Sequence, residues 1–302
     1  MYRRLHAEIF GGADSYFAPF IYASCGGVIG SGNLAELAPE NQGSVKLIPQ
    51  LLTNRAQDFL DTAKTLHGMG YEEVNLNLGC PSKTVVSKGR GAGFLKDPDG
   101  LEAFLDRVFS KADMKVSLKT RIGFERPEEF DRLLKIYGRF PISELIVHPR
   151  TGRDMYKGRP DMAAFQKAVD QLAIPICYNG DVMTAADGQN FNMHYPQITR
   201  LMAGRGLLAN PALARELHGG PPLPASELTL FHDRLLAGYD ERMAGSKKVL
   251  SLMKEQWQYW RLGFAGETRA LTDRLLRVTD RDLYLKLVNE IFASFAEDRK
   301  GV

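Results

Sequence analysis

The chain has 302 residues, of which 44% are hydrophobic and 25% are charged, with a formal net charge of +3. Such a chain can bury a sizeable core, and three scattered cysteines exclude a disulfide framework or a cysteine-rich zinc site. No apolar run approaches the roughly 20 residues that cross a bilayer, and the first residues, MYRRLHAEIFGG, lack the apolar core of a secretory signal. We therefore expect a cytoplasmic protein without a metal or a membrane partner.

Short strand-like runs alternate with amphipathic helical stretches from about residue 14 to residue 209. The clearest strands cover 45–51, 73–78, 115–120, 144–148, 175–179 and 200–203. Helical periodicity is clearest over 54–69 and 100–111. Strands separated by helices of this length require βαβ units and a parallel sheet. Right-handed crossovers then leave either an open doubly wound sheet or a closed (β/α)8 barrel.

Side chains capable of chemistry stand at the end of nearly every predicted strand. They are Gln50, Asn77, Lys119 with Arg121, His148 with Arg150, Asn179 with Asp181, and Gly204 with Arg205. The carboxyl ends of all strands converge on one site in a barrel, whereas an open sheet gathers only the strands beside its switch point. This distribution favours an α/β fold of the TIM-barrel type.

The character of the sequence changes after Gly219. The segment GGPPLP (219–224) is typical of a stiff connector, and the helical pattern then continues alone over 226–243, 246–260, 267–274 and 280–296. We predict a catalytic barrel domain over 1–218, a linker over 219–225 and a small all-helical domain over 226–302. Among the aromatic residues of the helical domain, Trp257 is expected in the packing core, with a weaker expectation for Tyr259 and Trp260.

The segment richest in chemistry is NLNLGCPSKTVVSKGRGAGFLK (75–96). A strand ends at Leu78, and Gly79 and Pro81 then force a turn that holds Cys80 at its apex. Burial in an inert environment is the common fate of free cysteine, and we expect it for Cys25 and Cys177. For Cys80, the turn and the nearby Lys83 favour a thiol with a role in acid–base chemistry.

Two basic segments flank the predicted active-site strands. One contains Lys83, Lys88, Arg90 and Lys96, and the other contains Arg150, Arg153, Lys157 and Arg159. Such segments are usually solvated loop faces, but two of them beside one cleft would bind a polyanion.

The run LNLGCPSKTV (76–85), followed by a glycine-rich basic stretch, closely resembles the active-site signature of tRNA-dihydrouridine synthases. The resemblance continues in order and covers nearly the whole chain. Its further parts are SLKTRIG (117–123), ELIVHPRT (144–151), IPICYNGDV (174–182), LMAGRG (201–206) and LMKEQWQYW (252–260).

The resemblance implies a reaction, two cofactors and a partner. Members of this family reduce the C5–C6 double bond of a D-loop uridine in tRNA, using FMN that NADPH recharges. By motif position, Cys80 would be the catalytic proton donor, and Lys83 and Arg150 would bind the substrate. The implied cofactor-binding residues are Gln50, Asn77, Lys119, His148, Asn179, Gly180, Asp181, Gly204 and Arg205. The helical domain would provide a second grip on tRNA, and we expect a monomer.

The sequence departs from the family pattern in two places. Family members begin with a strand of the type Ala-Pro-Met-x-Gly-x-Thr, which is missing here. Instead, MYRRLHAEIFGG resembles the first barrel helix, and the next strand-like run covers 15–21. We therefore expect a barrel without its first strand, with weak FMN binding or marginal stability. The second departure is Pro149, which stands where a small residue usually separates the histidine from the arginine.

Two other functions remain open from the sequence. One is an FMN barrel oxidoreductase that acts on a small pyrimidine-like substrate. The other is a non-catalytic RNA-binding relative that has lost its flavin. Flavin absorbance separates the second alternative from the two enzymes, and analysis of dihydrouridine in tRNA separates the enzymes from each other.

Overall fold

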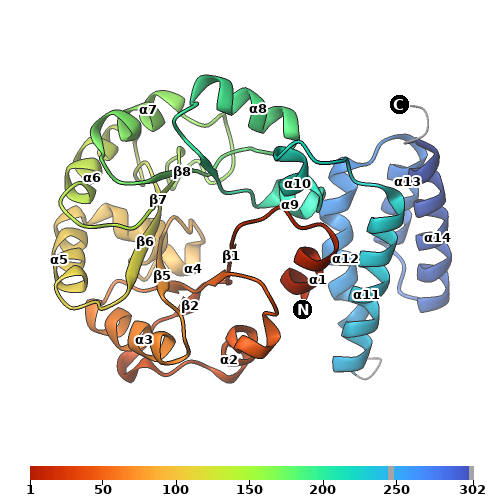
Figure 1. Ribbon diagram of the computed structural model, residues 1–302, viewed down its shortest axis with the longest axis horizontal. Coiled ribbons are helices and arrows are strands. Elements are labelled where there is room, and N and C mark those ends of the chain that lie inside the picture. Colours follow the sequence, from red (N-terminus) through yellow and green to blue (C-terminus); the bar gives the residue numbers. More distant parts are fainter. Residues whose placement is uncertain (244–247, 299–302) are drawn as a thin grey trace. The chain divides into compact units, whose positions relative to one another are not determined.

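A computed structural model of the chain describes residues 1–243 and 248–298. They fall into two compact units (Figure 1). The sheet unit contains Ser15–Asp181 and Asn192–Met202, and the helical unit contains Met1–Asp14, Val182–Phe191 and Ala203–Val302. These units divide the chain at other points than the predicted domain boundaries, which stay a prediction.

The sheet unit is built on seven parallel strands that follow one another in chain order. They are β2 (Ile21–Tyr22), β4 (Gln50–Leu52), β5 (Glu73–Leu78), β6 (Lys115–Arg121), β7 (Leu145–His148), β8 (Ile176–Tyr178) and β9 (Arg200–Leu201). The helices along its outer side are α3 (Ala56–Gly68), α5 (Pro98–Phe109), α6 (Phe130–Tyr137) and α7 (Met162–Gln171) (Figure 1). The predicted α/β fold of the TIM-barrel type is confirmed. Within the described residues β2 and β9 form the edges of this sheet, as expected for a barrel that lacks its first strand.

Shorter elements complete the connections. They are α2 (Ser31–Leu37), α4 (Lys83–Val86), α8 (Ala185–His194) and the 3₁₀ turns η1 (Cys25–Gly27), η2 (Pro39–Asn41), η3 (Gly91–Lys96) and η4 (Pro127–Glu129).

Strand β5 shows how the sequence prepares the two faces of the sheet. Val74, Leu76 and Leu78 are fully buried on one face, and Asn75 and Asn77 are buried on the other. Successive side chains of a strand point to opposite faces, so the apolar set and the amide set are separated by the strand geometry alone. The sheet therefore carries polar side chains on a buried face, and that face holds the candidate site.

Two prolines divide the strands near the start of the sheet. The predicted run 45–51 is split into β3 (Leu47–Ile48) and β4 around Pro49, and the run 15–21 is split into β1 (Tyr16–Phe17) and β2 around Pro19. Strand β1 pairs with β3 while β2 pairs with β4. Proline has no N–H to donate to a ladder. The prediction of one continuous strand was therefore wrong in both segments, each of which is interrupted at its proline.

The helical unit confirms the four predicted C-terminal helices. They are α11 (Ala225–Met243), α12 (Lys248–Trp260), α13 (Gly266–Leu275) and α14 (Arg281–Asp298), accompanied by α1 (Tyr2–Ile9), α9 (Arg205–Ala209), α10 (Leu213–Leu217) and the turn η5 (Arg261–Gly263). The predicted start of the second helix at 246–247 lies outside the described residues. No helix in the described ranges is both long and apolar enough to cross a membrane.

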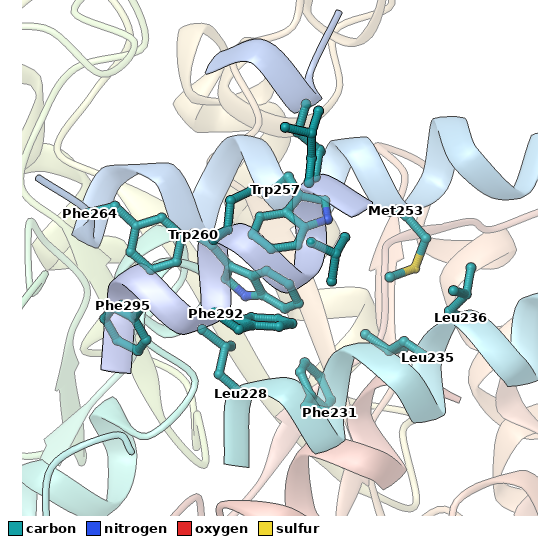
Figure 2. Packing of buried hydrophobic residues seen from close by; sticks show 14 of the residues in the cluster. Leu228, Phe231, Leu235, Leu236, Met253, Trp257, Trp260, Phe264, Phe292 and Phe295 are labelled. Atoms are coloured by element: carbon teal, nitrogen blue, oxygen red, sulfur yellow. The ribbon is translucent and has the colours of Figure 1, made fainter. Parts of the chain in front are cut away.

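Aromatic and aliphatic side chains fill the centre of the helical unit (Figure 2). Trp257 and Trp260 are fully buried, and their rings meet edge to face with centroids 4.8 Å apart. Tyr259 between them is only half-buried. The expectation of a packing role is therefore confirmed for both tryptophans, since a position three residues along α12 returns to the same face.

Helix α1 belongs to this apolar core. Leu5 and Phe10 are buried in it, and the Phe10 ring lies 5.1 Å from the Phe231 ring of α11. The interpretation of this segment as a first barrel helix was therefore wrong about its packing partner. That interpretation came from the resemblance to the family, whereas the apolar residues of this segment pack on α11.

Candidate active site

The candidate active site lies at the carboxyl ends of strands β5 to β8 in the sheet unit, together with Gln50 at the start of β4. Ladder register places Gln50 beside Asn75, Asn77 beside Lys119, and Arg121 beside His148. Asn179 follows β8, and its backbone N–H donates to the Val147 carbonyl of β7. The structure therefore brings the predicted residues of five neighbouring strands together, as the barrel interpretation requires.

The Cys80 turn is fixed through its backbone. The Asn77 side-chain oxygen accepts from the Gly79 and Cys80 N–H groups at 3.0 and 2.9 Å. The Cys80 carbonyl accepts from Ala92 N–H at 3.0 Å. Gly91 has a φ of +55°, and a Cβ there would lie 2.8 Å from the Cys80 carbonyl oxygen. The glycine-rich stretch thus allows the chain to close over a half-buried Cys80.

Arg121 joins the Cys80 turn to the loop after β7. Its Nε donates to the Gly79 carbonyl at 2.8 Å, and its Nη1 donates to the Thr151 carbonyl at 2.7 Å. The guanidinium is 1% exposed and lies 5.5 Å from the ring centroid of Tyr156. The sequence placed Arg121 at a strand end but assigned it no role, and Tyr156 was missed. The alternation of the strand, which puts Arg121 on the same face as Lys119, was the available signal.

Lys119 carries a charge that nothing nearby neutralises. Within residues 1–243 and 248–298, its ammonium makes no hydrogen bond and no ion pair. Burial, followed by repulsion from Arg121, lowers the pKa of Lys119 to about 8. The side chain is therefore still mostly protonated at neutral pH and is available to an anionic group.

His148 is held neutral in one tautomer. Burial, with repulsion from Arg121, Lys119 and Arg150, lowers the pKa of His148 to about 3. Arg150 Nη1 lies 3.2 Å from His148 Nε2. Because arginine only donates, Nε2 must accept and the proton must reside on Nδ1. His148 thus offers an N–H donor through Nδ1.

Arg150 is committed to partners inside the protein. It is 2% exposed, and its guanidinium makes two hydrogen bonds to the Asp181 carboxylate and one, of 2.6 Å, to the Gly158 carbonyl. The hydrogen bonds to Asp181 raise the pKa of Arg150. Asp181 thereby ties the loop after β8 to the loop after β7. The predicted contact of Arg150 with substrate stays a prediction.

The remaining predicted residues lie on separate elements. Lys83 is exposed at the first position of α4, and Asn179 Nδ2 donates to the Met202 carbonyl at 2.8 Å. Gly180 packs against the Tyr178 hydroxyl, where a Cβ would lie at 1.9 Å. Gly204 and Arg205 stand at the start of α9 in the helical unit, so their grouping with Asn179, Gly180 and Asp181 stays a prediction.

The other two cysteines differ from each other. Cys177 is buried, and burial raises the pKa of its thiol. Cys25 is exposed, so the expectation that it is buried was wrong. Gly26 and Gly27 follow it with positive φ, so the cysteine stands at the first position of a tight turn. The described part of the chain contains no cluster of three or more His, Cys, Asp or Glu side chains that could hold a metal ion.

Comparisons with known proteins agree on one family. The family model described as "Dihydrouridine synthase (Dus)" matches residues 30–260. A "tRNA-dihydrouridine synthase B" of Pasteurella multocida is 33% identical over 147 residues, which cover 48% of this chain and 44% of the relative. One from Vibrio vulnificus is 30% identical over 56% of this chain and 51% of the relative. One from Pseudomonas aeruginosa is 28% identical over 84% of this chain and 76% of the relative. The chain thus spans about half the length of the first two.

Two solved structures have a similar fold. A 2-naphthoyl-CoA reductase complex has a TM-score of 0.56 at 12% identity and covers 73% of this chain and 46% of its own. An old yellow enzyme homologue from Zymomonas mobilis has a TM-score of 0.51 at 11% identity, and the match covers 74% of this chain and 84% of the homologue. At such identities the likeness concerns the fold.

Proposed function

Because the chain belongs to the dihydrouridine synthase family, we propose that it reduces the C5–C6 double bond of a D-loop uridine in tRNA, with FMN as cofactor and NADPH as reductant. The observation that carries this proposal is the fixed turn of Cys80 beside Lys119 and Arg121. Arg121 Nε donates to the Gly79 carbonyl of this turn, and Lys119 pairs in register with Asn77, whose side chain accepts from the Cys80 N–H. The curated relatives are named as tRNA-dihydrouridine synthases.

The donor set at the strand ends fits a flavin. Neither Lys119 nor Arg121 forms an ion pair within the described residues, so the site has cationic groups to spare for a negatively charged ring edge. Gln50, Asn77, Lys119 and His148 would border the ring. The segments that contain Asn179, Gly180, Asp181, Gly204 and Arg205 would hold the phosphate, Asp181 only through its backbone and Arg205 as a bidentate partner. Bound FMN would supply the hydride that reaches C6 of the base.

The protein's own residues supply the proton and the positioning. The Cys80 thiol proton passes to C5 of the base, since a thiol suits a general acid at neutral pH. The resulting thiolate is stabilised by Lys119 and Arg121 and regains a proton from water. His148 can donate an Nδ1–H hydrogen bond to a carbonyl oxygen of the base or of the cofactor. The base must leave its stack to reach Cys80, and exposed Lys83 can then contact the RNA backbone.

We propose that the segment 226–302 provides a second tRNA contact, joined by the linker 219–225 to the catalytic segment 1–218, in a cytoplasmic monomer. Such a contact would come from a local basic patch, because the net charge of +3 is too small for strong attraction by bulk charge.

The test uses the purified chain, NADPH and tRNA that lacks dihydrouridine. Released flavin is identified by absorbance and mass, and dihydrouridine is measured by mass spectrometry of the tRNA fragments. We expect FMN and one new dihydrouridine in the D-loop. Reduction of free uracil or uridine instead of tRNA would contradict the proposed substrate. Protein without flavin that binds tRNA but leaves it unchanged would contradict the proposed activity.

A further inference from the structure

Four side chains form a continuous hydrogen-bond chain across three strands beneath the Cys80 turn. Asn75 Nδ2 donates to Ser117 Oγ at 3.0 Å, Gln50 Nε2 donates to Asn75 Oδ1 at 2.8 Å, and Asn77 Nδ2 donates to Gln50 Oε1 at 2.7 Å. Asn75 and Ser117 are fully buried, and Gln50 and Asn77 are each 7% exposed. The four side chains therefore form their hydrogen bonds with one another and have little contact with water.

The direction of every hydrogen bond in this chain is fixed from one end. Asn77 Oδ1 faces the N–H groups of Gly79 and Cys80, which only donate, so this oxygen must accept. The Asn77 NH₂ must then turn to Gln50 Oε1, which in turn directs the Gln50 NH₂ to Asn75 Oδ1. Asn75 consequently donates to Ser117. Reversing any one amide would set two donors or two acceptors against each other.

We propose that Asn75 and Ser117 are positioning residues for Cys80, which they fix in place through Gln50 and Asn77. This inference rests on the proposed role of Cys80 as proton donor. Asn75 and Ser117 lie below the strand ends and act only through their neighbours. Gln50 also keeps one N–H outside this hydrogen-bond chain, which it can donate at the start of β4.

The hydrogen-bond chain of Gln50, Asn75, Asn77 and Ser117 also predicts which substitutions are tolerated. Asn75→Ala removes the acceptor of Gln50, so the Gln50 amide can rotate and release Asn77. Asn75→Asp keeps an acceptor for Gln50, and burial favours its protonated form, whose hydroxyl donates to Ser117 Oγ as the Asn75 amide does. Ser117→Ala removes only the terminal acceptor and should have a smaller effect.

The experiment measures hydrogen–deuterium exchange of the full chain without tRNA, on a peptide that contains the Gly79 and Cys80 amides. We expect about tenfold faster exchange in Asn75→Ala, which corresponds to the loss of about one buried hydrogen bond, and wild-type exchange in Asn75→Asp. In turnover with tRNA, kcat of Asn75→Ala should fall on the order of 100-fold, as for a displacement of about 1 Å, while KM for tRNA stays the same.

Peptides from β6 and a thermal melt serve as controls for the fold. If the Gly79 and Cys80 amides of folded Asn75→Ala exchange at the wild-type rate, or if Asn75→Asp behaves like Asn75→Ala, the proposal is overturned. If Asn75→Ala does not fold, exchange of the Gly79 and Cys80 amides is compared between wild type and Ser117→Ala instead. Wild-type exchange rates in Ser117→Ala would then overturn the proposal. Exchange needs no turnover, so a wild-type protein without synthase activity would refute the proposed function while the exchange pattern still decides the positioning role.

Discussion

Two polar sites, one in each unit, differ in how fully their groups are satisfied. In the helical unit, Tyr284 accepts from Trp257 Nε1 at 2.9 Å and lies 2.8 Å from His232 Nε2, while His232 Nδ1 lies 2.8 Å from Asp233. These groups satisfy one another inside an aromatic core. In the sheet unit, Lys119 keeps a charge without a partner among the described residues.

The difference indicates where each unit gains stability and where the site gains reactivity. A buried group without a partner costs stability, and such groups concentrate at functional sites because a ligand can later provide the missing partner. A closed polar network such as that of Tyr284 has no donor left for a ligand. Substitutions in the helical core should therefore lower stability, whereas substitutions at the strand ends should lower activity with little loss of stability.

The largest expected effect is on turnover. Cys80→Ala should retain flavin and its reduction by NADPH but lose dihydrouridine formation by roughly two to four orders of magnitude, as expected for removal of a general acid. The matched control is Cys25→Ala, which changes an exposed thiol and should leave turnover unchanged. An equal loss of flavin reduction in Cys80→Ala would refute its assignment as proton donor.

The next effect concerns the core of the helical unit. Trp257→Ala should lower the free energy of unfolding by about 3–5 kcal/mol, because it leaves a large cavity and removes the donor to Tyr284. Urea denaturation measures this loss. Tyr259→Ala on the half-buried position of the same helix is the control and should cost far less. Equal losses for the two variants would show that the tryptophan is not a core residue.

Acidification should destabilise both units through histidines that are buried in the neutral form. Burial lowers the pKa of His6 in the helical unit to about 4, and the pKa of His148 is about 3. The unfolded chain takes up protons at about 6.5, so stability is complete above that pH and falls as the pH decreases toward the folded values. At pH 5 each residue should cost about 2 kcal/mol.

Thermal melts between pH 7.5 and 5 test this expectation. His6→Gln should remove part of the acid sensitivity of the helical unit, and His148→Gln should do the same for the sheet unit. A wild-type melting temperature that does not change over this range would contradict the burial of both histidines in the neutral form.

The smallest expected effect is that of Tyr284→Phe, about 1–2 kcal/mol of unfolding free energy, since it removes one hydroxyl and leaves Trp257 Nε1 without an acceptor. Turnover should not change. A variant as stable as the wild type would show that the network with His232 contributes nothing to the helical unit.

Features that depend on neighbouring residues could be predicted from the sequence. Alternation in β5, helical periodicity over α11 to α14 and the Gly79–Pro81 turn are local patterns, and all of them predicted the elements where the structure has them. The motifs also identified Cys80, Lys119 and His148 as residues of one set of strand ends. Proline positions carried a local signal as well, but Pro19 and Pro49 were not used to split the strands.

Which polar groups meet depends on the packing of distant segments. Gln50 and Asn75 are 25 residues apart and Asn75 and Ser117 are 42 apart, so their hydrogen bonds depend on strand register and not on local pattern. The same holds for the Arg150–Asp181 pair and for the tautomer of His148. The same holds for helix α1, whose apolar residues pack on α11, because the hydrophobic effect has no direction and does not specify a partner.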